Sequence, residues 1–172
     1  MFNKFVKWLK DTSGKTASYV VGVSAAIALT TSLIAPWEGL ELKPYKDIVG
    51  KTTWCYGETR GTPKSLYTSA ECLTLLRVAA AEFEQAIRPC LPTNLPVQTR
   101  ASFISLSYNI GSTAFCKSSV AKKAVAGDLR GACNSILLYN KAKVNGKLQP
   151  VKGLTNRRLS ERKQCLSGLG VS

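Results

Sequence analysis

The sequence predicts an α+β fold that is mainly helical, with one small β-hairpin lobe and an apolar helix near the N-terminus. Three observations support this prediction. Residues 16–36 carry no charged side chain, and a helix of that length spans about 31 Å. Residues 52–56 read Thr-Thr-Trp-Cys-Tyr and lie between two glycines, as expected for a strand in a tight hairpin. Apolar residues recur at helical spacing from residue 68 onward.

The first fifteen residues are basic and amphipathic. They hold four lysines against a single acid, Asp11, with apolar side chains interleaved. A basic segment before an apolar helix stays on the cytoplasmic side of a membrane, so we expect the N-terminus inside and the C-terminus outside. The same segment would also serve as the charged start of an export signal.

Residues 16–36 are only weakly apolar, with seven Val, Ile or Leu against twelve Ala, Gly, Ser or Thr. Three interpretations compete. A cleaved signal peptide would be cut after Ala35, but Pro36 is a poor residue to follow a cleavage site. A permanent anchor would need a more apolar helix. We favour the third interpretation, a helix that enters the membrane and later leaves it.

The candidate catalytic groups follow this segment directly. Glu38, Asp47 and Thr53 supply two carboxylates and a hydroxyl within one short stretch. Hydrolysis by paired acids requires one carboxyl group that protonates the leaving oxygen and a second group that activates or orients water. Glu41 is the nearby acid that competes with Glu38 for the first role, and an ordinary surface carboxylate is the simpler interpretation of either.

The rest of the chain is predicted to be mostly helical. Thr68 and Glu71 form a capping box, and the helix that they open ends before Pro89. Glu82 and Glu84 in this helix are interpreted as solvated surface acids. Further helices are expected at residues 97–109, 118–126, 128–139 and 154–166, with a basic loop and an Asn-Gly turn at 141–153.

The composition excludes several classes of site. The chain has no histidine, which removes His-based triads and most zinc sites, so we expect no metal and no cofactor. Lys and Arg outnumber Asp and Glu by 24 to 10, but they are dispersed, which favours an anionic cell envelope over nucleic acid as partner. The six cysteines include no CxxC pair and indicate disulfides formed in an oxidising compartment.

The candidate catalytic stretch resembles a family signature. Glu38 is followed after eight residues by Asp47, after five more by Thr53, and then by Gly57, a pattern similar to that of the phage-type lysozymes, glycoside hydrolase family 24. Later landmarks also look like that family: Leu106-Ser-Tyr-Asn-Ile-Gly111, Ala114-Phe115, and Gly153-Leu-Thr-Asn-Arg-Arg158 with Glu161 and Arg162. The resemblance covers residues 37–166 and implies the phage-lysozyme fold.

The N-terminal segment resembles the signal-anchor-release segments of endolysins from lambdoid phages or prophages. Residues 1–36 would then form a basic N-terminus and a releasable signal-anchor helix, and residues 37–172 would form the lysozyme catalytic domain. Some relatives restrain themselves with a cysteine inside the released segment. That route is closed here, because the first cysteine is Cys55.

The resemblance implies an inverting mechanism with three catalytic residues. Glu38 would be the general acid, Asp47 the ionised partner that stabilises positive charge at the sugar, and Thr53 the residue that holds the attacking water. Partial burial would favour the protonated form that Glu38 needs.

The resemblance also implies supporting residues. Arg157 would pair with Glu38, although Arg158 next to it fits the same role. Asn109 would bind substrate or, equally well, cap a helix. Tyr45 would line the sugar groove, unless it is an ordinary half-buried tyrosine.

Six cysteines permit 15 pairings, and the sequence does not choose among them. The resemblance implies the sequential pairing, because each bond would then join segments that are neighbours in the family fold: Cys55–Cys72, Cys90–Cys116 and Cys133–Cys165. Cys55 departs from the family pattern, since many relatives have glycine at this place in the strand.

These resemblances imply a monomeric endolysin that hydrolyses the β-1,4 bond between N-acetylmuramic acid and N-acetylglucosamine in bacterial peptidoglycan, causing host cell lysis. The host export machinery would insert residues 16–36 into the inner membrane, and the enzyme would be inactive until its release into the periplasm. Two alternatives remain: a non-catalytic cationic protein that binds the wall or disrupts membranes, and a lytic transglycosylase that uses Glu38 alone.

Overall fold

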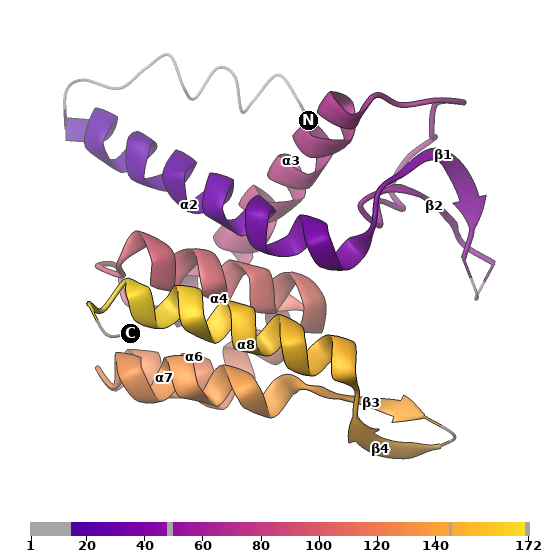
Figure 1. The fold of residues 1–172 in the computed structure, drawn as a ribbon. Helices are drawn as coiled ribbons and strands as arrows, with labels where there is room; N and C mark the ends of the chain where they lie inside the picture. The colour runs from indigo at the N-terminus through magenta and orange to yellow at the C-terminus, as the bar shows by residue number, and fades with distance from the viewer. Residues whose placement is uncertain (1–14, 48–49, 145, 171–172) are drawn as a thin grey trace.

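The computed structural model describes residues 15–47, 50–144 and 146–170. Of the basic amphipathic segment expected at residues 1–15, all but Lys15 lies outside the described residues. Three helices are stacked in layers (Figure 1): α4 (Val97–Ile110) lies between α2 (Lys15–Glu38) and α8 (Lys152–Ser167). The predicted fold class, mainly helical with a small β-hairpin, is confirmed.

Helix α4 is the centre of the core, as its apolar sequence predicts. Every residue from 101 to 107 is buried, and Phe103 packs against Phe115 with a ring-centroid distance of 5.8 Å. The helix also buries hydroxyl groups, and each bonds to a nearby acceptor: Ser107 Oγ, for example, donates to the Ile104 carbonyl at 2.8 Å. Because these hydroxyl groups are satisfied, their burial carries little penalty.

Helix α2 packs on α4 and belongs to the same core. Ala26, Ile27 and Ile34 are buried, and Thr30 Oγ1 lies 2.7 Å from the Ala26 carbonyl oxygen and 3.2 Å from that of Ala101. The helix runs without a break through residues 36 and 37, where the sequence suggests a boundary between segment and domain. Among the described residues, no helix combines the length and the apolar character needed to cross a membrane.

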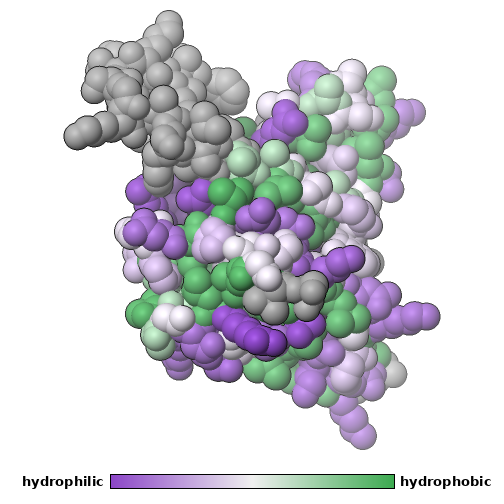
Figure 2. Space-filling view, turned by 60° about the vertical axis from the view of Figure 1, so that its left-hand side comes forward, coloured by the Kyte–Doolittle hydropathy of each residue, from purple (hydrophilic) through white to green (hydrophobic). Residues whose placement is uncertain are grey.

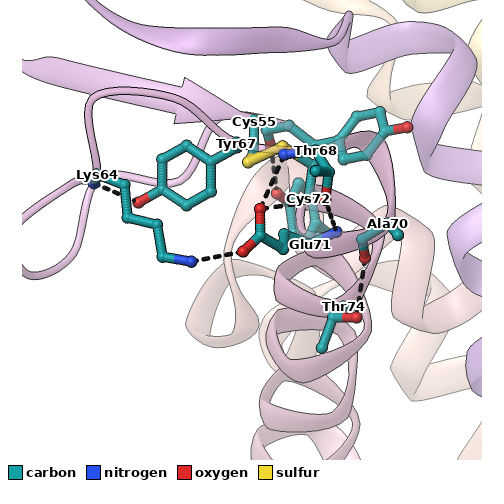
Figure 3. Close-up of a disulfide and its surroundings, with 10 residues drawn as sticks. Cys55, Lys64, Tyr67, Thr68, Ala70, Glu71, Cys72 and Thr74 are labelled. Carbon is teal, nitrogen blue, oxygen red and sulfur yellow. Dashed lines mark hydrogen bonds and ion pairs between the residues drawn. A yellow bond between two sulfur atoms is a disulfide. The ribbon is translucent and has the colours of Figure 1, made fainter.

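Helix α3 (Ser69–Ile87) begins at the predicted capping box. Thr68 Oγ1 accepts the Glu71 backbone N–H at 3.2 Å, and the Glu71 carboxylate accepts the Thr68 N–H at 2.8 Å. The disulfide between Cys55 and Cys72 lies directly beside this box and joins the hairpin to α3 (Figure 3). The first turn of α3 therefore fixes the position of the hairpin.

The small lobe is an antiparallel hairpin of β1 (Glu41–Lys46) and β2 (Thr52–Cys55). Tyr45 pairs with Thr53, and Glu41 pairs with Cys55 across an irregularity between them. Cys55 has φ 55°, which is in the left-handed region that favours glycine. A glycine would adopt this conformation without strain.

The helical lobe is completed by short elements. They are η1 (Arg88–Cys90), α5 (Ser112–Lys117), α6 (Ser119–Val125), α7 (Leu129–Ser135) and η2 (Ile136–Tyr139). The disulfide Cys90–Cys116 joins η1 to α5, and Cys133–Cys165 joins α7 to α8. The three bonds in the structure are thus those of the sequential pairing.

The connection before α8 is a hairpin, and the prediction of a loop at residues 141–153 is wrong. Strands β3 (Lys141–Val144) and β4 (Lys147–Pro150) pair in register, with Val144 opposite Lys147. An Asn-Gly sequence is a strong signal for a two-residue hairpin turn, and here it outweighs the low strand propensity of the lysine-rich flanks. The hairpin projects from the helical lobe (Figure 1).

Charged groups are spread over the surface, as the dispersed lysines and arginines indicate. On the coloured part of the face shown in Figure 2, hydrophilic and hydrophobic residues are intermixed. One acid departs from the prediction. The Glu84 side chain is only 12% exposed and pairs with Arg100 at 3.4 Å, so it is not a solvated surface acid.

Candidate active site

Glu38 is the last residue of α2, and its carboxylate meets α8. Arg157 Nη1 donates to Glu38 Oε1 at 2.7 Å, and the Glu38 side chain is 24% exposed. Arg157, and not its neighbour Arg158, therefore contacts Glu38. The other carboxylate oxygen lies near Gly57, where an added Cβ atom would stand 3.9 Å from Glu38 Oε2.

Arg157 and Arg158 share one buried carboxylate, that of Glu161. Arg157 Nε lies 3.3 Å from Glu161 Oε1, and Arg158 Nη2 donates to the same oxygen at 2.9 Å. Arg158 Nε is 2.8 Å from Glu161 Oε2, and Ser105 Oγ donates to Oε1 at 2.7 Å. The side chains of Arg158 and Glu161 are fully buried, and that of Arg157 is 4% exposed.

Burial is the largest influence on the pKa values of Arg158 and Glu161, and it shifts both towards the neutral form. Burial lowers the pKa of Arg158 to about 10, although the negative charge of Glu161 opposes this change. Since this pKa is still well above 7, Arg158 keeps its positive charge at neutral pH. Burial also raises the pKa of Glu161, while the two guanidinium groups and the Ser105 hydroxyl oppose that rise. The two guanidinium groups in contact with Glu161 favour its ionised carboxylate.

An open cleft of ≈ 480 Å³ lies in front of Glu38. It is bounded by the segment after β2, by one face of α3 and by the end of α4. The lining residues are Glu38, Gly57, Glu58, Thr59, Arg60, Ala79, Glu82, Phe83, Ala86, Tyr108 and Ser112. The cleft is open to solvent, so a polymer can lie in it without being enclosed.

One wall of the cleft holds an ion-pair network that sequence reasoning missed. Arg60 pairs with Glu58 at 2.7 Å and also with Glu82, which stands on α3. The pairing with Glu82 joins residues 22 positions apart, so no local pattern reveals it. Glu82 is exposed, as predicted, but it has a charged partner.

Hydrogen bonds hold Glu58 in its ionised form. Burial alone would raise its pKa, but bonds from the Arg60 side chain and from the backbone N–H groups of Thr59 and Arg60 outweigh burial and lower it. Burial raises the pKa of Tyr108 to about 12, and the charges of Glu38 and Glu58 add to that rise. Tyr108 thus remains a donor to the Tyr56 carbonyl at 2.8 Å.

Asp47 and Thr53 lie on the hairpin, outside the residues that line the cleft of ≈ 480 Å³. Asp47 Oδ1 accepts the Lys51 backbone N–H at 2.8 Å, which closes the turn between β1 and β2. Thr53 is buried, and its hydroxyl donates to the Lys51 carbonyl at 3.2 Å. The hairpin turn therefore orients both side chains.

The two expected substrate-binding residues are both exposed. Tyr45 is in β1, opposite Thr53. Asn109 lies within α4, and its Oδ1 accepts a hydrogen bond from Arg158 Nη1 at 3.1 Å. The residue that caps α4 is Gly111, so Asn109 is not the cap. Within residues 15–47, 50–144 and 146–170, no cluster of His, Cys, Asp or Glu could hold a metal ion.

The chain is similar to phage lysozymes along most of its length. The sequence model of the phage lysozyme family matches residues 35–161. The SAR-endolysin of Bacteriophage PS34 is 37% identical over 160 residues, covering 88% of this chain and 93% of that relative. The SAR-endolysin of Enterobacteria phage P21 is 37% identical over 163 residues, covering 90% of this chain and 95% of its own length.

Solved structures of similar fold include an endolysin and a muramidase domain. The endolysin from Escherichia coli O157:H7 phage FAHEc1 has a TM-score of 0.71 and 27% identity, covering 83% of this chain and 90% of that one. The muramidase domain of SpmX from Asticaccaulis excentricus has a TM-score of 0.72 and 25% identity, covering 83% of this chain and 95% of that one.

Proposed function

The chain belongs to the phage lysozyme family and is a lysozyme, and we propose that Glu38 is the general acid with which it cleaves peptidoglycan. The bond cut is the β-1,4 linkage between N-acetylmuramic acid and N-acetylglucosamine. The contact that carries this proposal is the one between Glu38 and Arg157, which holds a partly exposed carboxyl group at the edge of the cleft.

In the proposed reaction Glu38 protonates the oxygen of the leaving sugar. Asp47 stays ionised and stabilises the positive charge that develops at the sugar carbon, and Thr53 holds the attacking water. Water attacks from the face opposite the leaving group, so the configuration inverts. The exposed side chains of Asn109 and Tyr45 would contact the glycan.

The membrane stage of this proposal follows from the position of Glu38. The general acid stands at the end of the same helix, α2, that holds the weakly apolar residues 16–36. A helix inside a bilayer cannot also pack on α4, and so cannot bring Glu38 to Arg157. The enzyme would be inactive while residues 16–36 are in the host inner membrane, N-terminus inside, and active in the periplasm after release.

The decisive test is lysis of outer-membrane-permeabilised cells by purified chain. We expect Glu38→Gln to lower the rate at least about a hundredfold, because an amide cannot donate the proton. Glu41→Gln is the matched control, since it makes the same change three residues away on the exposed side of β1, and it should lyse normally. Full lysis by Glu38→Gln would instead favour cationic membrane damage.

Analysis of the released sugars separates hydrolysis from transglycosylation. We expect reducing-end N-acetylmuramic acid and a clear loss of rate in Asp47→Asn and Thr53→Ala. Anhydro-sugar products, together with full activity of Thr53→Ala, would overturn the inverting mechanism in favour of a lytic transglycosylase.

A further inference from the structure

We infer that Glu161 is a positioning residue that sets, through Arg157, the pH range over which Glu38 can donate its proton. Glu161 is fully buried and lines no part of the cleft, so it acts on the reaction without touching substrate. This inference rests on the proposed role of Glu38 as general acid.

The geometry makes Arg157 a shared partner. Its Nη1 donates to Glu38 Oε1 at 2.7 Å, while its Nε faces Glu161 Oε1 at 3.3 Å, one helical turn further along α8. Glu161 Oε1 is in turn held by Ser105 Oγ and Arg158 Nη2. A change in the charge at Glu161 therefore reaches Glu38 through one guanidinium group.

The charge balance of the cluster decides the direction of the effect. Arg157 and Arg158 bring two positive charges beside Glu38, and Glu161 cancels one of them. A general acid must be protonated before it reacts, and uncompensated positive charge favours its ionised form. By offsetting one of these positive charges, Glu161 therefore favours the protonated form of Glu38.

Other charged or titratable groups also face the cleft side of Glu38. They are Glu58, Arg60 and Glu82, which line the cleft together with Glu38, and Tyr108 on α4. Arg60 and Glu82 are exposed, so water and salt screen their charges, whereas the Arg157–Glu161–Arg158 cluster is buried and screened far less. The buried cluster consequently has the stronger influence on Glu38.

Two substitutions of opposite charge test this inference. Glu161→Gln removes the compensating negative charge, and we expect the alkaline limb of the lysis rate against pH to move down by about one pH unit. Arg158→Gln removes a positive charge and should move the same limb up. The double variant removes one positive and one negative charge, so the net charge of the cluster is unchanged. Its limb should return close to the original position.

Each variant is first checked for folding by circular dichroism and thermal melting. If Glu161→Gln does not fold, Arg158→Gln and the double variant still decide the question. Glu84→Gln is the matched control, because it also removes the acid of a mostly buried Glu–Arg pair, and it should leave the limb in place.

The inference is overturned if the folded variants lose activity by the same factor at every pH, because a purely structural role predicts that result. It is also overturned if Arg158→Gln and Glu161→Gln move the limb in the same direction. A parallel assay of Glu38→Gln keeps the two proposals apart. An active Glu38→Gln contradicts the role of Glu38 as general acid. If Glu38→Gln is inactive but the alkaline limbs of Glu161→Gln and Arg158→Gln do not move, only the role of Glu161 is contradicted.

Discussion

Gly57 connects a backbone requirement with the candidate acid. Its φ of 82° lies in the left-handed region, where residues with a Cβ atom are strained. A methyl group there would also contact Glu38 Oε2, at 3.9 Å. The glycine in the family signature therefore has two physical reasons, the turn after β2 and the open approach to the carboxyl group.

We predict that Gly57→Ala lowers the free energy of unfolding by about 1 kcal/mol and the lysis rate by roughly tenfold, because a residue with a Cβ atom is strained at this φ and relief of the strain shifts the cleft wall beside Glu38. Gly153→Ala is the control, since Gly153 lies in α8 without a left-handed φ and has open space around it. That variant should be at least as stable as the original chain by urea unfolding. A fully active Gly57→Ala would contradict the argument.

Helix α3 is the element on which the small lobe depends. Its capping box fixes the first turn, and the Cys55–Cys72 disulfide attaches β2 to that turn (Figure 3). Trp54 stacks on Tyr67 nearby, with ring centroids 6.3 Å apart. The hairpin that carries Asp47 and Thr53 is thus held from one end of α3.

At this scale we predict that Thr68→Ala lowers the free energy of unfolding by about 1 kcal/mol, because the Glu71 backbone N–H loses its acceptor, the Thr68 hydroxyl. Thr74→Ala removes a threonine of the same helix whose hydroxyl bonds only to the Ala70 carbonyl. It should be neutral or slightly stabilising by chemical denaturation, since alanine is the better helix former. Equal losses in the two variants would contradict the importance of the cap.

The same capping box makes stability depend on acid pH. A side-chain hydrogen bond from Lys64, with further bonds from the Thr68 backbone and hydroxyl, lowers the pKa of Glu71 from 4.5 to about 2. Because the folded pKa is the lower one, this contribution is complete above about 4.5 and is lost as the pH falls towards 2. The melting temperature of Glu71→Gln should therefore fall less steeply across this range than that of the original chain.

At the scale of the whole molecule, the segment proposed to enter the membrane is also part of the folded core. Ala26, Thr30 and Ile34 are completely buried against the rest of the chain. The weakly apolar composition of this helix gives small side chains that pack closely on α4. In the proposed membrane stage, release and folding would be a single event, because the helix that leaves the membrane would bring Glu38 with it.

We predict that a chain starting at Trp37 neither folds cooperatively nor lyses cells, because α4 would lose the helix that covers it and Glu38 would lose its helical support. Circular dichroism melting and the turbidity assay measure the two losses. A chain starting at Lys15, which keeps all of α2, is the control and should fold and lyse. Full activity of the Trp37 variant would mean that residues 16–36 act only in export and restraint.

Local sequence determined much of this protein. The capping box at Thr68 and Glu71, the hairpin glycines and the apolar periodicity of α3 depend on neighbouring residues, so their structures follow from short-range rules. The spacing of Glu38, Asp47 and Thr53 is also a local pattern, but their catalytic roles rest on the family resemblance and stay predictions. The β3–β4 hairpin was missed because its lysine-rich strands have little strand propensity, although the Asn-Gly turn was visible.

Only the tertiary structure decided which arginine contacts Glu38. Arg157 and Arg158 are adjacent in sequence, and α8 directs one towards Glu38 and the other towards Asn109. The structure alone also revealed the burial of Glu161 and the contact between Arg60 and Glu82, which join distant parts of the chain. Charge pairs of this kind depend on how helices pack, and packing is a property of the whole core, which no short stretch of sequence contains.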